Sequence, residues 1–201
     1  MPSALSEPIA PPPLESVPRK RWTRAEIEEL TSMGWFDGEH YELIDGELIN
    51  KMGKHETHVV AVMIIQSWLT AIFGYWRVRK EDPMDVATQD NEHNEPEPDL
   101  VVLKEPIQNL RMRRPGPEDV LLAIEVADST LRMDRSKKAD LYARAGIPDY
   151  WILDMQNRRM IVHREPAAGR YASVVAYRAD ESLAPLAAPD SEFRVSQAFG
   201  E

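Results

Sequence analysis

The pattern of apolar and polar positions predicts a mixed α/β chain whose most informative stretch covers 121–154. Residues 121–126 form a short apolar run of the length of a buried strand, with one acid, Glu125, near its end. A helix is predicted next, for which Asp134 is the expected N-cap and Gly146 the glycine that follows the last turn. A second apolar strand completes the order strand, loop, helix, strand.

Helical spacing separates two adjacent lysines in this predicted helix. Leu141, Tyr142 and Ala145 form its apolar stripe, and steps of three and four residues back from the stripe reach Lys138. Lys138 is therefore expected to face inward, whereas Lys137 points about 100° away, toward solvent. A lysine at the edge of a buried stripe can also extend its ammonium group to water, so this helix alone leaves the role of Lys138 open.

Capping, turn and periodicity signals predict the remaining elements. Thr23 and Glu26 form a capping box that opens a short helix. Asp45 and Gly46 suit a two-residue type I′ turn in a hairpin over 41–50. Periodicity further predicts a long helix over 55–73 and strands over 75–80, 84–89, 100–103, 159–164 and 171–178.

These elements predict a single α/β domain built on a mixed β-sheet. The chain has 201 residues, enough for one domain with a substantial core. Its first segment contains SEPIAPPPLESVP, whose three consecutive prolines and lack of an apolar period predict a disordered tail. The expected organisation is a Pro-rich tail over 1–20 and one domain over 21–201.

Composition and charge exclude several classes of protein. The chain has no cysteine, which excludes disulfides and thiolate metal sites. No apolar run approaches the ~20 residues of a membrane helix, and no signal-peptide core is evident, so a cytoplasmic protein without membrane contact is expected. The net charge of -10 argues against non-specific coating of nucleic acid. A local basic patch, or else ordinary solvated charge, is offered by Arg111, Arg113, Arg114, Arg132, Arg135 and Lys137.

Carboxylates at two strand ends supply candidate metal ligands. Asp99 stands at the mouth of the strand over 100–103, and Pro98 fixes the chain that enters it. Glu125 lies on a strand expected to be buried, where an unpaired charge is costly and a metal ion is one suitable partner. Two hard oxygen ligands together with the ammonium group of Lys138 suit magnesium and a phosphate.

A resemblance to a known family lies in three segments: YELIDGELI over 41–49, EPDLVVL over 97–103, and AIEVADSTLRMDRSKKADLYARAGIPDYWILD over 123–154. They resemble the Uma2 family of endonucleases, within the PD-(D/E)XK nuclease superfamily. The resemblance implies a restriction-endonuclease-like α/β core, in which a central mixed β-sheet is flanked by helices. It also implies hydrolysis of phosphodiester bonds, with DNA as the expected substrate and Mg²⁺ or Mn²⁺ as cofactor. The superfamily's lysine usually lies two residues after the acid, where this chain has Ala127; in the family it lies on the following helix, which matches Lys138.

The resemblance also implies a role for each candidate residue. Asp99 and Glu125 would hold the metal, with the backbone carbonyl of Val126 or Ala127 as a further ligand. Lys138 would orient the attacking water or stabilise the phosphate in the transition state.

Glu42 and two histidines have two interpretations each. Many nucleases of this superfamily carry an acid ahead of the aspartate motif, so Glu42 is a candidate accessory catalytic acid; the alternative is a solvent-facing strand residue. His55 and His58, in the first turn of the long helix, could bind metal, but the sequence shows no third ligand with supporting spacing. His58 matches a histidine often found at this position in the family, and orienting the helix or lining the cleft is its preferred role.

Two other functions share these features. The fold could serve as a non-catalytic binding or assembly module with a vestigial site, or the hydrolase could act on RNA or a nucleotide. Stabilisation by millimolar Mg²⁺ would separate a working site from a vestigial one. The expected partner is nucleic acid, DNA first, and a homodimer is left open.

Removal of residues 1 to about 20 should leave the melting temperature nearly unchanged. The segment offers few apolar side chains to offset the entropy lost on ordering it. Thermal unfolding of the full and trimmed chains at equal concentration measures this. A drop of several degrees on trimming would show instead that the tail docks, onto the domain or onto a second subunit.

Overall fold

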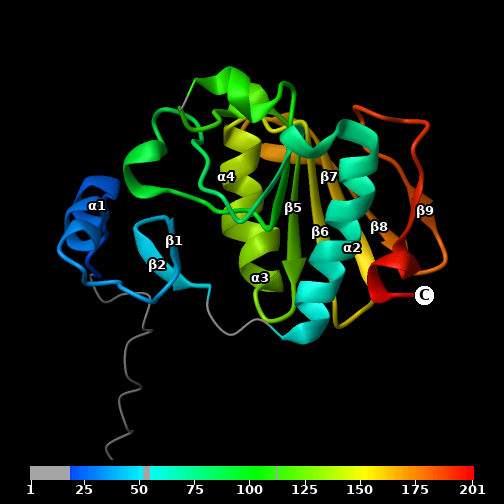
Figure 1. The fold of residues 1–201 in the computed structure, drawn as a ribbon, viewed down its shortest axis with the longest axis horizontal. Coiled ribbons are helices and arrows are strands. Elements are labelled where there is room, and N and C mark those ends of the chain that lie inside the picture. Colours follow the sequence, from blue (N-terminus) through cyan, green and yellow to red (C-terminus); the bar gives the residue numbers. More distant parts are fainter. Residues whose placement is uncertain (1–18, 52–54, 112) are drawn as a thin grey trace, which may run out of the picture.

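A six-stranded mixed sheet forms the centre of the computed structural model, which describes residues 19–51, 55–111 and 113–201 (Figure 1). Among its neighbouring strands β5 and β6 are parallel, and the other pairs are antiparallel. All of the predicted Pro-rich tail except Arg19 and Lys20 lies outside the described residues. In spatial order the strands are β3 (Val78–Lys80), β4 (Leu100–Leu103), β5 (Val120–Ala127), β6 (Asp149–Asp154), β7 (Arg159–Ala167) and β8 (Arg170–Arg178).

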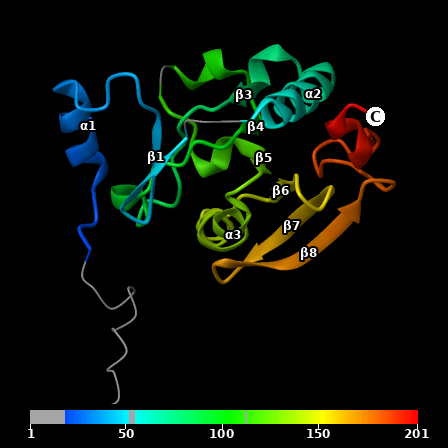
Figure 2. The same cartoon turned by 90° about the horizontal axis from the view of Figure 1, so that it is seen from below.

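Helices cover both faces of this sheet (Figure 2). On one face α2 (Glu56–Phe73) packs together with the C-terminal 3-10 helix η7 (Val195–Phe199). On the other lies the helix that follows β5, over 131–144, which we call the composite helix. The predicted fold class, an α/β domain with a central mixed sheet flanked by helices, is therefore confirmed. The smaller elements are η2 (Tyr75–Arg77), η3 (Asn91–His93), η4 (Ile107–Leu110), η5 (Pro117–Asp119), β9 (Ser182–Leu183) and β10 (Phe193–Arg194).

Helix α2 spans the predicted range and ends at Gly74 as expected. Its buried side chains include Ala61, Val62, Ile65 and Leu69, which pack against the sheet. By length and composition alone α2 also satisfies the criteria for a membrane-spanning helix, which the sequence interpretation did not anticipate. Five of its side chains are buried against the sheet and the site described below, whereas Val60 and Met63 are exposed.

The composite helix departs from its predicted start. It begins at Leu131, as α3 (Leu131–Met133), continues through a π-helical turn, η6 (Asp134–Lys138), and ends as α4 (Ala139–Arg144). Asp134 is therefore not the N-cap: it lies inside the helix, buried, and accepts a hydrogen bond from Thr130 Oγ1 at 2.6 Å. In a sequence, an acid that points inward from the first turn of a helix cannot be told from an acid that caps the helix N-terminus. The end is as predicted, at Gly146 with a φ of 75°.

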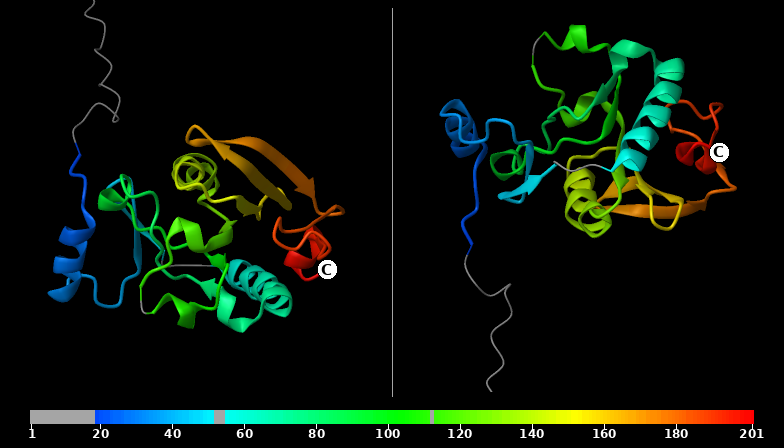
Figure 3. Two further views of the ribbon diagram at one scale, coloured as in Figure 1. Left: turned by 90° about the horizontal axis from the view of Figure 1, so that it is seen from above. Right: turned by 60° about the horizontal axis from the view of Figure 1, so that its bottom comes forward.

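The N-terminal hairpin forms as its turn residues predict. Strands β1 (Tyr41–Ile44) and β2 (Glu47–Asn50) pair antiparallel across Asp45 and Gly46, whose φ values of 53° and 76° are those of a type I′ turn. Helix α1 (Arg24–Ser32) precedes it and starts with the predicted capping box. The hairpin and α1 lie at the end of the molecule away from the C-terminus (Figure 3).

The predicted strand over 84–89 is wrong. Met84 and Val86 are buried, which produced the alternating pattern, but their neighbours are irregular segments rather than strands. The Met84 amide donates to Pro96 O, and the Asp85 amide to Pro115 O. The preceding prediction, over 75–80, is half right, since the segment starts as η2 and becomes β3 only at Val78. The strand pair predicted over 159–164 and 171–178 is present as β7 and β8.

Gly46→Ala should destabilise the protein by about 1 kcal/mol more than Gly38→Ala. Both glycines have positive φ, 76° and 82°, so both substitutions incur the roughly 1–2 kcal/mol cost of the left-handed region. Only at Gly46 would the new Cβ meet a neighbour, Arg21 Cβ at 2.8 Å, whereas nothing lies within 4 Å at Gly38. Urea unfolding of the two variants measures the free energy of unfolding of each. Equal decreases in the two variants would show that the segment around Arg21 moves aside freely.

Candidate active site

Strand register brings the two predicted metal ligands together. Strands β4 and β5 are antiparallel with Leu100 opposite Ile124, so Asp99, one residue before β4, lies beside Glu125. The Val126 amide donates to Asp99 Oδ2 at 2.8 Å and fixes that carboxylate at the strand end. Both acids are almost wholly buried. Alternation along the two strands places them on the face opposite to Leu100 and Ile124, which pack toward α2.

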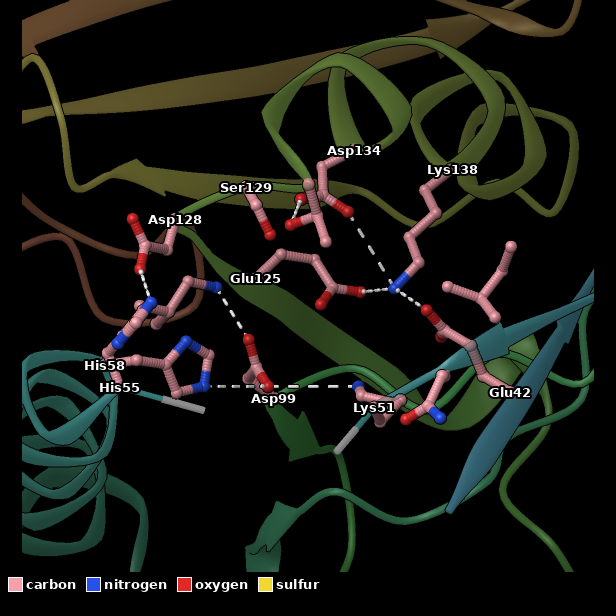
Figure 4. Close-up of a pocket in the computed structure, with 14 residues that line it drawn as sticks. Glu42, Lys51, His55, His58, Asp99, Glu125, Asp128, Ser129, Asp134 and Lys138 are labelled. Atoms are coloured by element: carbon pink, nitrogen blue, oxygen red, sulfur yellow. Dashed lines mark hydrogen bonds and ion pairs between the residues drawn. The ribbon is translucent and has the colours of Figure 1, made fainter. Parts of the chain in front are cut away.

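A single ammonium group, that of Lys138, lies among three carboxylates (Figure 4). Lys138 Nζ is 2.8 Å from Glu42 Oε1, 2.8 Å from Glu125 Oε1 and 3.9 Å from Asp134 Oδ1. The Lys138 side chain is 2% exposed. These acids come from β1, β5 and the π-helical turn, so the hairpin, the sheet and the composite helix all meet at this ammonium group.

The helix phase predicted for the two lysines is confirmed. Lys138 points inward, whereas the Lys137 side chain is 43% exposed and donates to Glu47 Oε2 at 2.7 Å. Tyr142, one turn after Lys138, donates its hydroxyl to Glu125 Oε1 at 3.2 Å. Glu125 Oε1 thus accepts from both side chains, which orients the carboxylate toward the composite helix.

Among the described residues, the side chains of His58 and Lys51 also lie close to Asp99. His58, in the first turn of α2, places Nε2 at 3.4 Å from Asp99 Oδ1. Lys51, at the end of the hairpin, places Nζ at 3.8 Å from the same oxygen and donates to Glu97 O. Figure 4 shows the Asp99 carboxylate between Lys51 and His58.

Burial and neighbouring charges perturb the pKa values of these acids in opposite directions. Burial raises the pKa of Glu125 to about 8, against the lowering effect of Lys138. Burial also raises the pKa of Asp134, again against Lys138. For Asp99 the raising effect of burial is outweighed by His58, Lys51 and the Val126 amide, so its pKa is held well below the usual value. Asp99 is therefore ionised, whereas Glu125 and Asp134 retain their protons to higher pH than usual, because burial is only partly offset by the one ammonium group that they share.

These side chains line a cavity of about 130 Å³, large enough for several waters or a hydrated ion. Its donor set, several buried carboxylate oxygens, fits a hard divalent cation such as Mg²⁺. The lining residues are Glu42, Ile49, Asn50, Lys51, His55, His58, Asp99, Glu125, Val126, Asp128, Ser129, Thr130, Asp134 and Lys138.

All five predicted site residues reach this cavity: Glu42, Asp99, Glu125, Val126 and Lys138. Glu42 is buried rather than solvent-facing. Their catalytic and metal-binding roles stay predictions. The sequence interpretation missed Lys51, for which it offers no signal, and treated Asp134 as a cap although its spacing of four from Lys138 places both on one helix face.

Half of the predicted basic patch is paired with acids. Arg113 pairs with Asp119 at 2.6 Å, and Arg114 with Glu95 at 2.6 Å. With Lys137 bonded to Glu47, three of the six candidate cations have acidic partners. Ordinary solvated charge is the better interpretation for these three.

Comparison with known proteins agrees with this fold. The Uma2 family, described as "Putative restriction endonuclease", matches residues 25–196. A search among curated proteins gives no match. Among solved structures, a "putative nuclease belonging to DUF820" from Anabaena variabilis ATCC 29413 superimposes with a TM-score of 0.61 at 14% identity, over 80% of this chain and 89% of that one. At this identity the likeness shows the fold.

In metal-free buffer, Glu125→Gln should gain stability relative to the wild type as the pH rises from about 4.5 to about 8. The pKa of Glu125 is raised on folding, so its contribution to stability is present below the unfolded pKa and lost as the pH rises through the folded value. Glutamine cannot ionise, so the difference should change by on the order of 2 kcal/mol across this range. Urea unfolding with chelator at several pH values measures it. A difference independent of pH would mean that Lys138 keeps Glu125 ionised throughout.

Proposed function

This chain belongs to the Uma2 family, and we propose that it is a metal-dependent endonuclease that hydrolyses phosphodiester bonds of DNA. Membership of this family supports the broader class, a nuclease. The observation that carries the finer proposal is the convergence of Asp99, Glu125 and Lys138 on one cavity. Carboxylates for a metal beside a buried ammonium for a phosphate or water are the groups that phosphodiester hydrolysis requires.

Asp99 and Glu125, with the backbone carbonyl of Val126 as a further ligand, would hold Mg²⁺ or Mn²⁺. A bound ion of this kind lowers the pKa of a water molecule and neutralises charge that builds on the phosphate. Asp99 is suited to this role because its low pKa keeps it ionised. A bound cation would stabilise the ionised form of Glu125 more than that of Asp99, because burial raises the pKa of Glu125. Metal binding would therefore release a proton from the Glu125 cluster near neutral pH.

Lys138 acts on the reacting groups through its charge. Its pKa is well above the usual value, since Glu125, Glu42 and Asp134 outweigh the lowering effect of burial, so it stays protonated and cannot serve as a base at neutral pH. A fixed ammonium group of this kind orients a water molecule or stabilises negative charge on a phosphate. Glu42 is a positioning residue in this scheme: it holds the ammonium from the hairpin side, at 2.8 Å.

Lys138→Gln should lower Mg²⁺-dependent cleavage of plasmid DNA by on the order of 10²-fold or more, whereas Lys137→Gln should keep most of the activity. The two lysines are adjacent, but only Lys138 lies in the cavity, and Lys137 pairs with Glu47 on the surface. Cleavage is measured at equal metal and salt. Replacing plasmid by single-stranded DNA or RNA in the same assay tests the substrate.

Removing Lys138 leaves three buried acids without their cation, so this variant is expected to lose stability. Glu125→Gln, which lowers the buried negative charge, is the second test and should be equally inactive. Thermal unfolding shows which variants are folded. Wild-type cleavage by folded Lys138→Gln and Glu125→Gln would contradict the proposed site, and an inactive wild type that gains no stability from millimolar Mg²⁺ would favour a non-catalytic module.

A further inference from the structure

A third acid lies beside Asp99 on the side opposite to Glu125. Strands β3 and β4 are antiparallel with Lys80 opposite Leu100, so Glu81, one residue after β3, lies beside Asp99. The Glu81 amide donates to Pro98 O at 3.2 Å and to Asp99 O at 3.3 Å. These bonds hold Glu81 in the left-handed region, at a φ of 50°. The register of three strands therefore places Glu81, Asp99 and Glu125 in one row across the sheet.

A buried histidine points at this row from α2. The His58 side chain is 9% exposed, and its Nε2 has no hydrogen-bond partner among the residues that the structure describes. The same Nε2 lies 3.4 Å from Asp99 Oδ1 (Figure 4). A buried imidazole nitrogen without a hydrogen bond is costly, and a metal ion is one group that would satisfy it.

The three side chains are close enough to share one ion. One ligand atom from each of His58, Glu81 and Asp99 lies within 4.8 Å of the other two. Ligands on opposite sides of a divalent ion, with bonds of about 2.1 Å, are separated by about 4.2 Å. Closing this distance requires movements of a few tenths of an ångström per side chain, within the reach of a glutamate and an imidazole.

We propose that His58, Glu81 and Asp99 form a cation site of their own, which takes a divalent transition metal in preference to Mg²⁺. The preference follows from the ligands, since an imidazole nitrogen favours transition metals and carboxylates alone suit Mg²⁺. Asp99 belongs also to the site of the proposed function, so its two oxygens would join two ions. The new site does not depend on that function, because the proposed function assigns no role to Glu81 or His58, although His58 lines the same cavity.

Among the residues that the structure describes, Lys80 and Lys51 are near this site and have to accommodate the ion. Lys80 Nζ is 4.0 Å from Glu81 Oε2, and Lys51 Nζ is 3.8 Å from Asp99 Oδ1. Both side chains are long and have several rotatable bonds, so their ammonium groups can withdraw when a divalent ion supplies the positive charge. Competition with these cations makes the affinity of the site dependent on ionic strength.

Titration of the full chain with Mn²⁺, followed by calorimetry and by electron spin echo of the bound ion, tests the proposal. The expected result is a Mn²⁺ ion whose spectrum shows coupling to an imidazole nitrogen. Glu81→Gln should weaken the binding of this ion at least tenfold, and His58→Gln should also remove the nitrogen coupling. Excess Mg²⁺ should not displace this Mn²⁺ ion at concentrations that would displace Mn²⁺ from a site with oxygen ligands alone.

Matched controls separate ligation from charge and from folding. His55→Gln replaces the other first-turn histidine, whose side chain is 77% exposed, and should change neither affinity nor coupling. Glu56→Gln removes one exposed negative charge from the same turn and should have the same small effect. Metal-free thermal unfolding should show every variant folded; if Glu81→Gln or His58→Gln is not, Glu81→Asp and His58→Asn take its place.

The Mn²⁺ experiment distinguishes a failure of this metal site from a failure of the proposed function. Mn²⁺ bound without nitrogen coupling, with an affinity unchanged in Glu81→Gln, would overturn the site, whatever the effect of Glu125→Gln. If the nitrogen-coupled Mn²⁺ is lost in Glu81→Gln but binds with unchanged affinity in Glu125→Gln, the result would support the site, even in a chain with no nuclease activity.

Discussion

The burial of one ammonium group among three carboxylates is the constraint on which the rest of this structure depends. Lys138 is withdrawn from water, and a charge in such surroundings is tolerated only when its partners are in place. The partners come from separate elements, Glu42 from the hairpin, Glu125 from the central sheet and Asp134 from the π-helical turn. The position of the hairpin against the sheet is therefore an electrostatic requirement as much as a matter of apolar packing.

The same cluster divides the acids of the cavity into two kinds. Asp99 accepts a hydrogen bond from the Val126 amide, has the side chains of His58 and Lys51 beside it, and stays ionised. Glu125 shares Lys138 with its neighbours and retains a proton to unusually high pH. Neighbouring carboxylates whose pKa values are driven apart are typical of catalytic sites. Here the difference between the two pKa values arises from the register of adjacent strands. It places Asp99 beside the Val126 amide and Glu125 beside Lys138, which Glu125 shares with other acids.

Local signals predicted much of the fold and part of the site. The Asp45–Gly46 turn, the capping box of α1 and the phase of Lys138 against Lys137 depend on short-range geometry, and the structure agrees with each. Contacts between distant segments could not be predicted in this way. Met84 alternates like a strand residue but bonds to an irregular segment, and Glu81 reaches Asp99 only through a register that no single strand reveals. Asp134 was misassigned because a cap and an inward acid share the same sequence pattern.

The distance along the chain between Glu42 and Lys138 has a consequence for the order in which the protein folds. The sheet and the composite helix can form from neighbouring segments, but at that stage Lys138 lacks the acid that the hairpin supplies. Contacts between segments so far apart in the chain form slowly, because the loop between them has to close. In an intermediate in which the hairpin has not yet docked, the ammonium group of Lys138 would be neither fully paired nor fully solvated. Such a species is poorly populated, so hairpin docking and the consolidation of the core become one cooperative event. The residues that line the cavity would thereby also couple the docking of the hairpin to the folding of the core.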